Sequence, residues 1–138
     1  MNADDCLFCK IVSGKIPAEK IYEDEDILAF MDIGPISDGH SLVIPKHHCE
    51  WLHECPPEVL SKVASQLGKI AGAVASAMNS DGYNILCNNG RAAGQLVKHL
   101  HFHIIPRNVS DGVFNRWPSY KYEDGKIEAI SVEIREKL

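Results

Sequence analysis

The sequence lacks two features that would point to a membrane or to nucleic acid: a long uninterrupted apolar run and an excess of basic residues. No apolar stretch approaches the roughly 20 residues that span a bilayer. Lysine and arginine number 14 against 19 acidic residues, which gives a formal net charge of −5. Such a charge argues against non-specific binding to nucleic acid or to an anionic membrane. A small anionic ligand is still compatible with it, since a local pocket of donors can oppose the overall charge.

The sequence also has neither an even number of cysteines nor the residue pattern of a secretory signal at its N-terminus. The five cysteines are an odd number, and the N-terminal residues MNADDCLFCK begin with acids instead of a basic segment followed by an apolar one. A disulfide framework is therefore not expected, and the sequence predicts a cytoplasmic protein with reduced thiols.

Hydrophobic patterning predicts one domain over residues 1–138, of class α+β, with a mostly antiparallel sheet of about five strands. One long helix is expected over 56–78, where apolar residues recur at three- and four-residue steps and two prolines suit the helix start. Short strands are expected at 19–24, 26–33, 40–46, 83–89 and 98–107, and short helices at 6–15 and 127–138. The long helix can cover one face of the sheet.

Three of the seven histidines, His99, His101 and His103, stand at every second position of the segment HLHFH. In an extended strand they would share one face. A row of this kind can form a metal site, a row of catalytic groups or a solvated polar face. The spacing alone does not separate these three interpretations.

The segment NNGRAAGQ (88–95) leads directly into the histidine row. Its glycines permit unusual backbone angles, and exposed N–H groups in such a loop can form a concavity for an anion. A plain glycine turn would look the same. Beside a row of imidazoles, however, the loop favours a phosphate ligand, because a neutral imidazole can attack phosphorus to give a covalent phospho-histidine.

The segment HLHFHII (99–105) resembles the signature of the histidine triad family, in which three histidines alternate with apolar residues. The N-terminal half of the chain and the segment before the histidine row, GYNILCNNGRAAGQLVKH, are also similar to the family. The resemblance therefore covers about residues 4–107. It implies a HIT-like fold and a nucleotide-binding hydrolase similar to the Hint (purine nucleoside phosphoramidase) branch. That branch acts at the α-phosphate through a nucleotidyl-histidine intermediate.

The resemblance also implies a role for individual residues. The nucleophile would be His101, His103 would contact the phosphate and the leaving group, and His40 would support the site. The residues that match the family's nucleotide contacts are Phe8, Ile11 and Phe30 at the base, Asp32 at the ribose hydroxyls with Ile33 beside it, Gly94 and Gln95 in the loop that holds the phosphate, and Asn88 as a polar contact beside that loop. Without the resemblance, the four apolar residues of this set would be interpreted as ordinary core.

One position departs from the family pattern. The eukaryotic phosphoramidase branch has serine after Gly-Gln, placed to assist the leaving group, whereas this chain has Leu96. Leucine has no proton to donate. That step would therefore fall to His103 or to water.

The pair Cys6–Cys9, with two residues between, is the recurrent half of a zinc site, although a redox pair would have the same spacing. Some bacterial-type family members that resemble this chain carry a structural zinc. By that resemblance the ligands would be Cys6, Cys9, His48 and His99, a set suited to tetrahedral zinc. The adjacent His47 is an alternative to His48, and the rival cluster consists of Cys49, His53 and Cys55. No organic cofactor is expected.

Three other functions stay open from the sequence. They are cleavage of dinucleoside polyphosphates, nucleotide binding by a regulatory protein with weak catalysis, and hydrolysis by one catalytic metal held on all three histidines. The expected partner is a purine nucleotide or nucleotide conjugate.

The family implies a homodimer, joined edge to edge through the sheets or through the long helix. Indirect support comes from a stripe of small residues on that helix, Ala64, Gly68, Ala71, Gly72 and Ala75. Trp117 could reach across such an interface.

Overall fold

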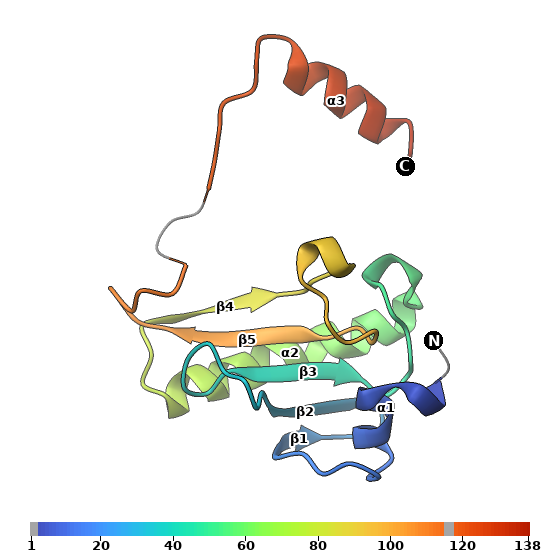
Figure 1. Ribbon diagram of the computed structural model, residues 1–138, viewed down its shortest axis with the longest axis vertical. Coiled ribbons are helices and arrows are strands. Elements are labelled where there is room, and N and C mark those ends of the chain that lie inside the picture. The colour runs from blue at the N-terminus through green and yellow to red at the C-terminus, as the bar shows by residue number, and fades with distance from the viewer. Residues whose placement is uncertain (1–2, 115–117) are drawn as a thin grey trace.

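The computed structural model describes residues 3–114 and 118–138, so Trp117 lies outside the described residues. It has the expected α+β architecture, a five-stranded sheet with helices on both faces (Figure 1). The strands are β1 (Lys20–Glu23), β2 (Ile27–Met31), β3 (Ser41–Pro45), β4 (Gly82–Leu86) and β5 (Phe102–Arg107). Their order is β1-β2-β3-β5-β4, and every neighbouring pair is antiparallel. The helices are α1 (Leu7–Val12), α2 (Pro57–Ala77) and α3 (Lys126–Arg135), with 3₁₀ turns at Ala3–Asp5, Leu52–Glu54 and Arg91–Ala93.

Both faces of the central strands are apolar because a helix covers each one. Alternate residues of β2 and β3, such as Ala29 and Val43, pack with Val63 and Ile70 of α2. The intervening residues of the same strands, with Phe8 and Ile11 of α1, form the core on the other face; these residues are Leu28, Phe30, Leu42 and Ile44. The period of two along each strand thus assigns every side chain to one of two cores.

Helix α2 confirms the predicted long helix, beginning at the second of its two prolines. The small-residue stripe does not form one free surface, because Ala71 is fully buried in the core beneath the helix. A Cβ added at Gly68 or Gly72 would meet nothing within 4 Å, so these two glycines face away from the core.

Strand β5 is shorter than the predicted 98–107, because it begins only at Phe102. The preceding residues turn: the N–H of His99 donates to the carbonyl of Val97 (2.9 Å), and the N–H of Leu100 donates to the carbonyl of Cys49 (2.7 Å). His99 and His101 therefore lie before the strand, so their side chains need not point to the same face of the sheet.

Other predicted boundaries differ by a few residues. Helix α1 ends at Val12 because Gly14 adopts a positive φ of 76°. Strand β4 ends at Leu86, before the loop that contains Asn88 and Gly94.

The chain leaves the sheet after β5 and ends in α3, which lies apart from the sheet in Figure 1. No α3 side chain is buried, and Ile127, Val132 and Ile134 are exposed apolar residues on it. Among the described residues, no helix combines the length and the apolarity needed to cross a bilayer.

Candidate nucleotide and metal sites

A cavity of about 300 Å³ opens on the α1 face of the sheet. Eight of the residues predicted to bind nucleotide line it: Phe8, Ile11, Phe30, Asp32, Ile33, Gly94, His101 and His103. A second cavity of about 310 Å³ lies on the opposite face, between α2 and the sheet, and no histidine lines it. The histidines therefore identify the first cavity as the candidate reaction site.

The cavity has a buried end and an open rim. Phe8, Ile11 and Phe30 are each no more than 6% exposed, and the Phe8 and Phe30 rings meet edge to face with centroids 5.4 Å apart. In contrast, Ile33 is fully exposed and Leu96 is 90% exposed. Core packing thus describes the first three residues but not Ile33.

His101 is buried at 5% exposure and lies between Phe8 and His103, with ring centroids 5.2 and 5.0 Å away. Its Nδ1 lies 2.6 Å from the carbonyl oxygen of His99. A carbonyl only accepts, so Nδ1 carries the proton, and Nε2 has the free lone pair. Burial lowers the pKa of His101, which favours the neutral, nucleophilic ring.

His103 is held by a hydrogen-bonded chain. The backbone N–H of Ile36 donates to Nδ1 of His40 (3.0 Å), which leaves the proton of His40 on Nε2. That N–H donates to Nδ1 of His103 (2.8 Å). The proton of neutral His103 is therefore on Nε2, where it can be donated to a ligand. Burial lowers the pKa of His40 and lowers that of His103 to about 4, so both rings are neutral near pH 7.

Asp32 lies at the end of β2, beside this pair. Its Oδ1 accepts the N–H of Gly34 (2.8 Å), and its Oδ2 lies 3.5 Å from Nε2 of His40. The carboxylate is oriented by these contacts and also lines the cavity. It is the only acidic residue among the described lining residues.

The glycine-bearing loop is closed by Gln95. The Gln95 side chain is buried, accepts the N–H of Gly90 (2.7 Å) and donates to the carbonyl of Glu50 (2.8 Å). The Gln95 N–H also donates to the carbonyl of Gly90 (3.1 Å). Gln95 therefore holds the loop together, while Gly94 reaches the cavity with a φ of 90°. Asn88 lies directly behind Gly94, 3.4 Å from where a Cβ would be.

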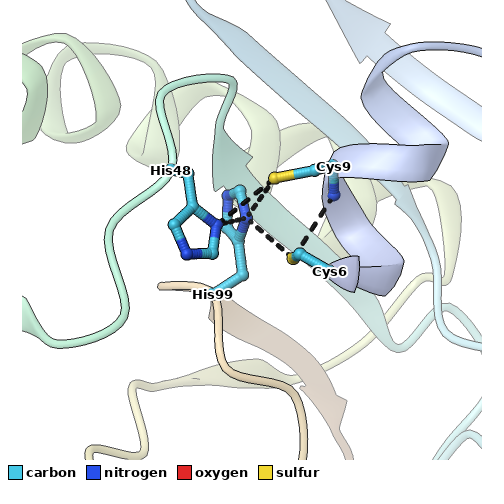
Figure 2. A group of neighbouring side chains, drawn as sticks. All are labelled: Cys6, Cys9, His48 and His99. Atoms are coloured by element: carbon cyan, nitrogen blue, oxygen red, sulfur yellow. Dashed lines mark hydrogen bonds between the residues drawn. The ribbon is translucent and has the colours of Figure 1, made fainter. Parts of the chain in front are cut away.

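The four predicted zinc ligands converge behind the histidine row, as Figure 2 shows for Cys6 and Cys9 at α1 and for His48 and His99. Sulfur and Nδ1 atoms lie 3.3 to 3.5 Å apart, and the two Nδ1 atoms lie 3.3 Å apart. Zinc bonds of about 2.3 Å to sulfur and about 2.05 Å to nitrogen give tetrahedral edges of about 3.6 Å for S···N and about 3.3 Å for N···N. The donor set therefore has the size of a zinc site.

The proton positions fit the same conclusion. His99 is fully buried, and its Nε2 donates to the carbonyl of Pro45 (2.8 Å), which leaves the lone pair of Nδ1 directed at the cluster. Burial lowers the pKa of His99 to about 4, which keeps the ring neutral, the form that binds a metal. A metal-ligating histidine typically makes this second hydrogen bond to a carbonyl.

The alternative metal ligands do not converge. His47 is exposed and belongs to no cluster of ligand atoms in the described chain. Cys49 and Cys55 pack in a small apolar cluster with Leu100, while the His53 ring packs against Trp51.

Several groups in these sites carry no signal in the sequence. The backbone groups of Ile36, Pro45 and His99 fix the tautomers of His40, His99 and His101. Every residue type has the carbonyl, and every type except proline has the N–H. Met31, Leu42 and Val97 also line the cavity and would be interpreted as ordinary core from the sequence.

Comparison with known proteins agrees with the geometry. The HIT domain model matches residues 13–109. The adenosine 5'-monophosphoramidase hnt1 of Schizosaccharomyces pombe is 45% identical over 134 residues, which cover 96% of this chain and 98% of that protein.

Solved structures show the same fold. A HIT family member from Bacillus subtilis superposes with a TM-score of 0.90 at 42% identity, covering 97% of both chains. A zinc-bound histidine triad family protein from Mycobacterium smegmatis superposes with a TM-score of 0.76 at 37% identity, covering 99% of this chain and 100% of that one. The buried histidine row, the glycine loop and these matches together show that this chain belongs to the histidine triad (HIT) family.

Proposed function

We propose that this protein hydrolyses substituents from the α-phosphate of purine nucleoside monophosphates, with phosphoramidates as the leading substrate class. The observation that carries the proposal is the proton position of buried His101, whose Nδ1–H is donated to the His99 carbonyl and whose Nε2 lone pair is free. The phosphoramidase activity named for the fission-yeast relative supports the choice of adenosine conjugates.

The reaction has two steps on phosphorus. The lone pair of His101 Nε2 forms a bond to phosphorus, and the bond to the leaving group breaks with its electron pair going to that group. Water then attacks phosphorus, the bond to His101 breaks, and the nucleoside monophosphate departs. The proton that water loses balances the proton that the leaving group gains. The His99 carbonyl stabilises the charged ring of the intermediate through the Nδ1–H bond.

The phosphate oxygens are bound by neutral donors. The Nε2–H of His103 is one, positioned by His40 from the other side of the ring. Within the described chain, the backbone N–H groups of Leu96 and Val97 make no hydrogen bond and both residues line the cavity, so they are the loop's available donors. Gly94 allows the backbone to approach the ligand, and Gln95 acts indirectly by holding the loop. Asn88 lies behind Gly94.

The nucleoside occupies the rest of the cavity. The base lies against Phe8, Ile11 and Phe30 at the buried end, whereas Ile33, next to Asp32, lies at the open rim. The ribose hydroxyls donate to Asp32, whose carboxylate accepts hydrogen bonds only.

The test is the variant His101→Ala, assayed with adenosine 5'-phosphoramidate. Turnover falls at least 10³-fold when the nucleophile is lost, while AMP binding measured by calorimetry persists. The exposed His53 offers a matched control, and His53→Ala retains full turnover. An unchanged rate in His101→Ala would overturn the mechanism.

We also propose a structural zinc on Cys6, Cys9, His48 and His99, supported by the edge lengths of that cluster. The metal would connect α1 to His48, which follows β3, and to His99, which precedes β5. It takes no part in the phosphoryl steps. The single-metal hydrolase alternative is disfavoured, because His99 directs its lone pair at the cysteines while His101 faces the cavity.

We propose further that the protein is a cytoplasmic homodimer. All five cysteines are free thiols, the state that a reducing compartment maintains. The proposed interface is the exposed edge of β4, where Tyr83 and Ile85 are 44% and 36% exposed.

A further inference from the structure

We propose that the leaving group of the substrate is an amine whose substituent is apolar and uncharged, recognised by Leu96 and Ile33 at the rim of the cavity. The inference rests on the proposed phosphoramidase function and adds the identity of the group that is expelled. It concerns the position at which this chain has leucine where the eukaryotic branch has serine.

The location of the leaving group follows from the burial of the nucleophile. In an in-line displacement the attacking and departing atoms lie on opposite sides of phosphorus. His101 attacks from the buried side, where it is 5% exposed. The leaving group is consequently directed away from the buried end of the cavity, toward its open rim.

The rim presents apolar surface to that group. Leu96 is 90% exposed and Ile33 is fully exposed, yet both line the cavity that contains His101 and His103. Neither side chain is supported by the core. An alkyl or aryl group placed between them would remove apolar surface of both partners from water.

The charges around the cavity also favour an uncharged leaving-group substituent. No lysine or arginine is among the cavity-lining residues that the structure describes, and Asp32 is the one acidic side chain among them. A leaving group with several phosphates would bring negative charges that no cation here compensates. A phosphoramidate carries one negative charge, which neutral N–H donors can bind.

The proton balance is compatible with an apolar rim. His101 Nε2 bonds to phosphorus while the phosphorus–nitrogen bond breaks, and the amine nitrogen keeps the electron pair and takes a proton from water. Leu96 supplies no proton, and hydrolysis of the phospho-histidine returns one proton to solvent. The products are the free amine and the nucleoside monophosphate.

The experiment compares two adenosine phosphoramidates of equal chain length, made with hexylamine and with 6-aminohexanoate. The wild-type protein prefers the hexyl conjugate in kcat/KM by about tenfold. In Leu96→Ser and in Ile33→Ser this preference falls several-fold, since each loses one side of the apolar contact. Both side chains are exposed, so the variants fold, which thermal unfolding verifies. Leu138→Ser changes an equally exposed leucine away from the cavity and keeps the wild-type ratio.

The possible outcomes distinguish a failure of this inference from a failure of the proposed phosphoramidase function. Equal turnover of both conjugates by the wild-type protein overturns the apolar leaving group and leaves the phosphoramidase intact. A preference that survives in both serine variants overturns the assignment to Leu96 and Ile33. Failure of the wild-type protein to hydrolyse any phosphoramidate, including the unsubstituted one, overturns both proposals.

Discussion

At the scale of single residues, three histidines of one motif acquire different chemistry from the group that each ring faces. His99 donates from Nε2 to Pro45 and has its lone pair on Nδ1, whereas His101 donates from Nδ1 to a carbonyl and has its lone pair on Nε2. His103 is kept as an Nε2–H donor because His40 occupies its Nδ1. In the function proposed above, the same type of side chain thus serves as metal ligand, nucleophile and neutral donor.

The lowered pKa of His103 makes stability depend on pH. Burial holds this pKa at about 4 in the folded protein, against about 6.5 in the unfolded chain. As pH falls below about 6.5 the unfolded chain therefore binds the proton first, and stability decreases until the pH reaches about 4. This one group accounts for a loss of about 2 kcal/mol in the free energy of unfolding between pH 7 and pH 5.

Urea denaturation at the two pH values measures this loss. The control is His103→Gln, which has no titrating group at this position but keeps the zinc ligands and the other histidines. We expect the variant to lose about 2 kcal/mol less than the wild-type protein over the same pH interval. Equal losses in the two proteins would contradict the neutral state of His103.

How much of the site the sequence predicts depends on whether side-chain or backbone atoms form it. The family resemblance predicted Phe8, Asp32 and His101 as site residues, and all three line the cavity, because the resemblance is carried by side chains. The proton positions depend on backbone groups of Ile36, Pro45 and His99, which have no residue signature. Gln95, predicted to belong to the loop that holds the phosphate, uses its amide within that loop, because the backbone carbonyls and N–H groups there need partners.

At the scale of elements, the proposed zinc site would connect parts of the chain that are otherwise weakly joined. Helix α1 has six residues, too few for an isolated helix to be stable, and its N-cap is Cys6 itself. Zinc bound to Cys6 and Cys9 would fix this helix to His48 and His99. Because Phe8 contacts both His99 and His101, the helix position determines one wall of the cavity.

Metal analysis tests this connection. Protein purified without added metal is expected to contain about one zinc per chain, and chelation is expected to lower Tm, because metal binding favours the folded state. Cys9→Ser loses the metal and the extra stability. Cys87→Ser, which changes a cysteine outside the cluster, retains both. Wild-type protein with no bound metal and full stability would exclude the zinc.

The elements themselves were largely predictable, and their ends were not. Apolar spacing identified all five strands and the long helix, because burial on one or two faces imposes a period. The start of β5 was predicted four residues early, since nothing in HLHFH reveals that Leu100 hydrogen-bonds to Cys49 instead of a neighbouring strand.

At the scale of the whole molecule, the two edges of the sheet differ in protection. Strand β1 carries Lys20 and Glu23, which form ion pairs, and its register with β2 shifts between Lys20 and Tyr22. Charges and irregularities of this kind discourage pairing with another strand. Strand β4 has the sequence GYNIL, without a charge, and alternates in exposure along its length. The unprotected edge is therefore the surface where a second copy would continue the sheet.

Sedimentation of matched edge variants tests this interface. We expect the wild-type protein to have the mass of two chains, and Ile85→Lys, at an exposed position of β4, to shift it toward the mass of one chain because a buried unpaired ammonium opposes association. Ile21→Lys places the same charge at a position of β1 that is 42% exposed, and it leaves the dimer intact. If Ile21→Lys dissociates the protein while Ile85→Lys does not, β1 forms the interface. If the wild-type protein sediments as one chain, the dimer proposal is wrong. The cavity on the α1 face is lined by residues of one chain, so catalysis there would then need no second subunit.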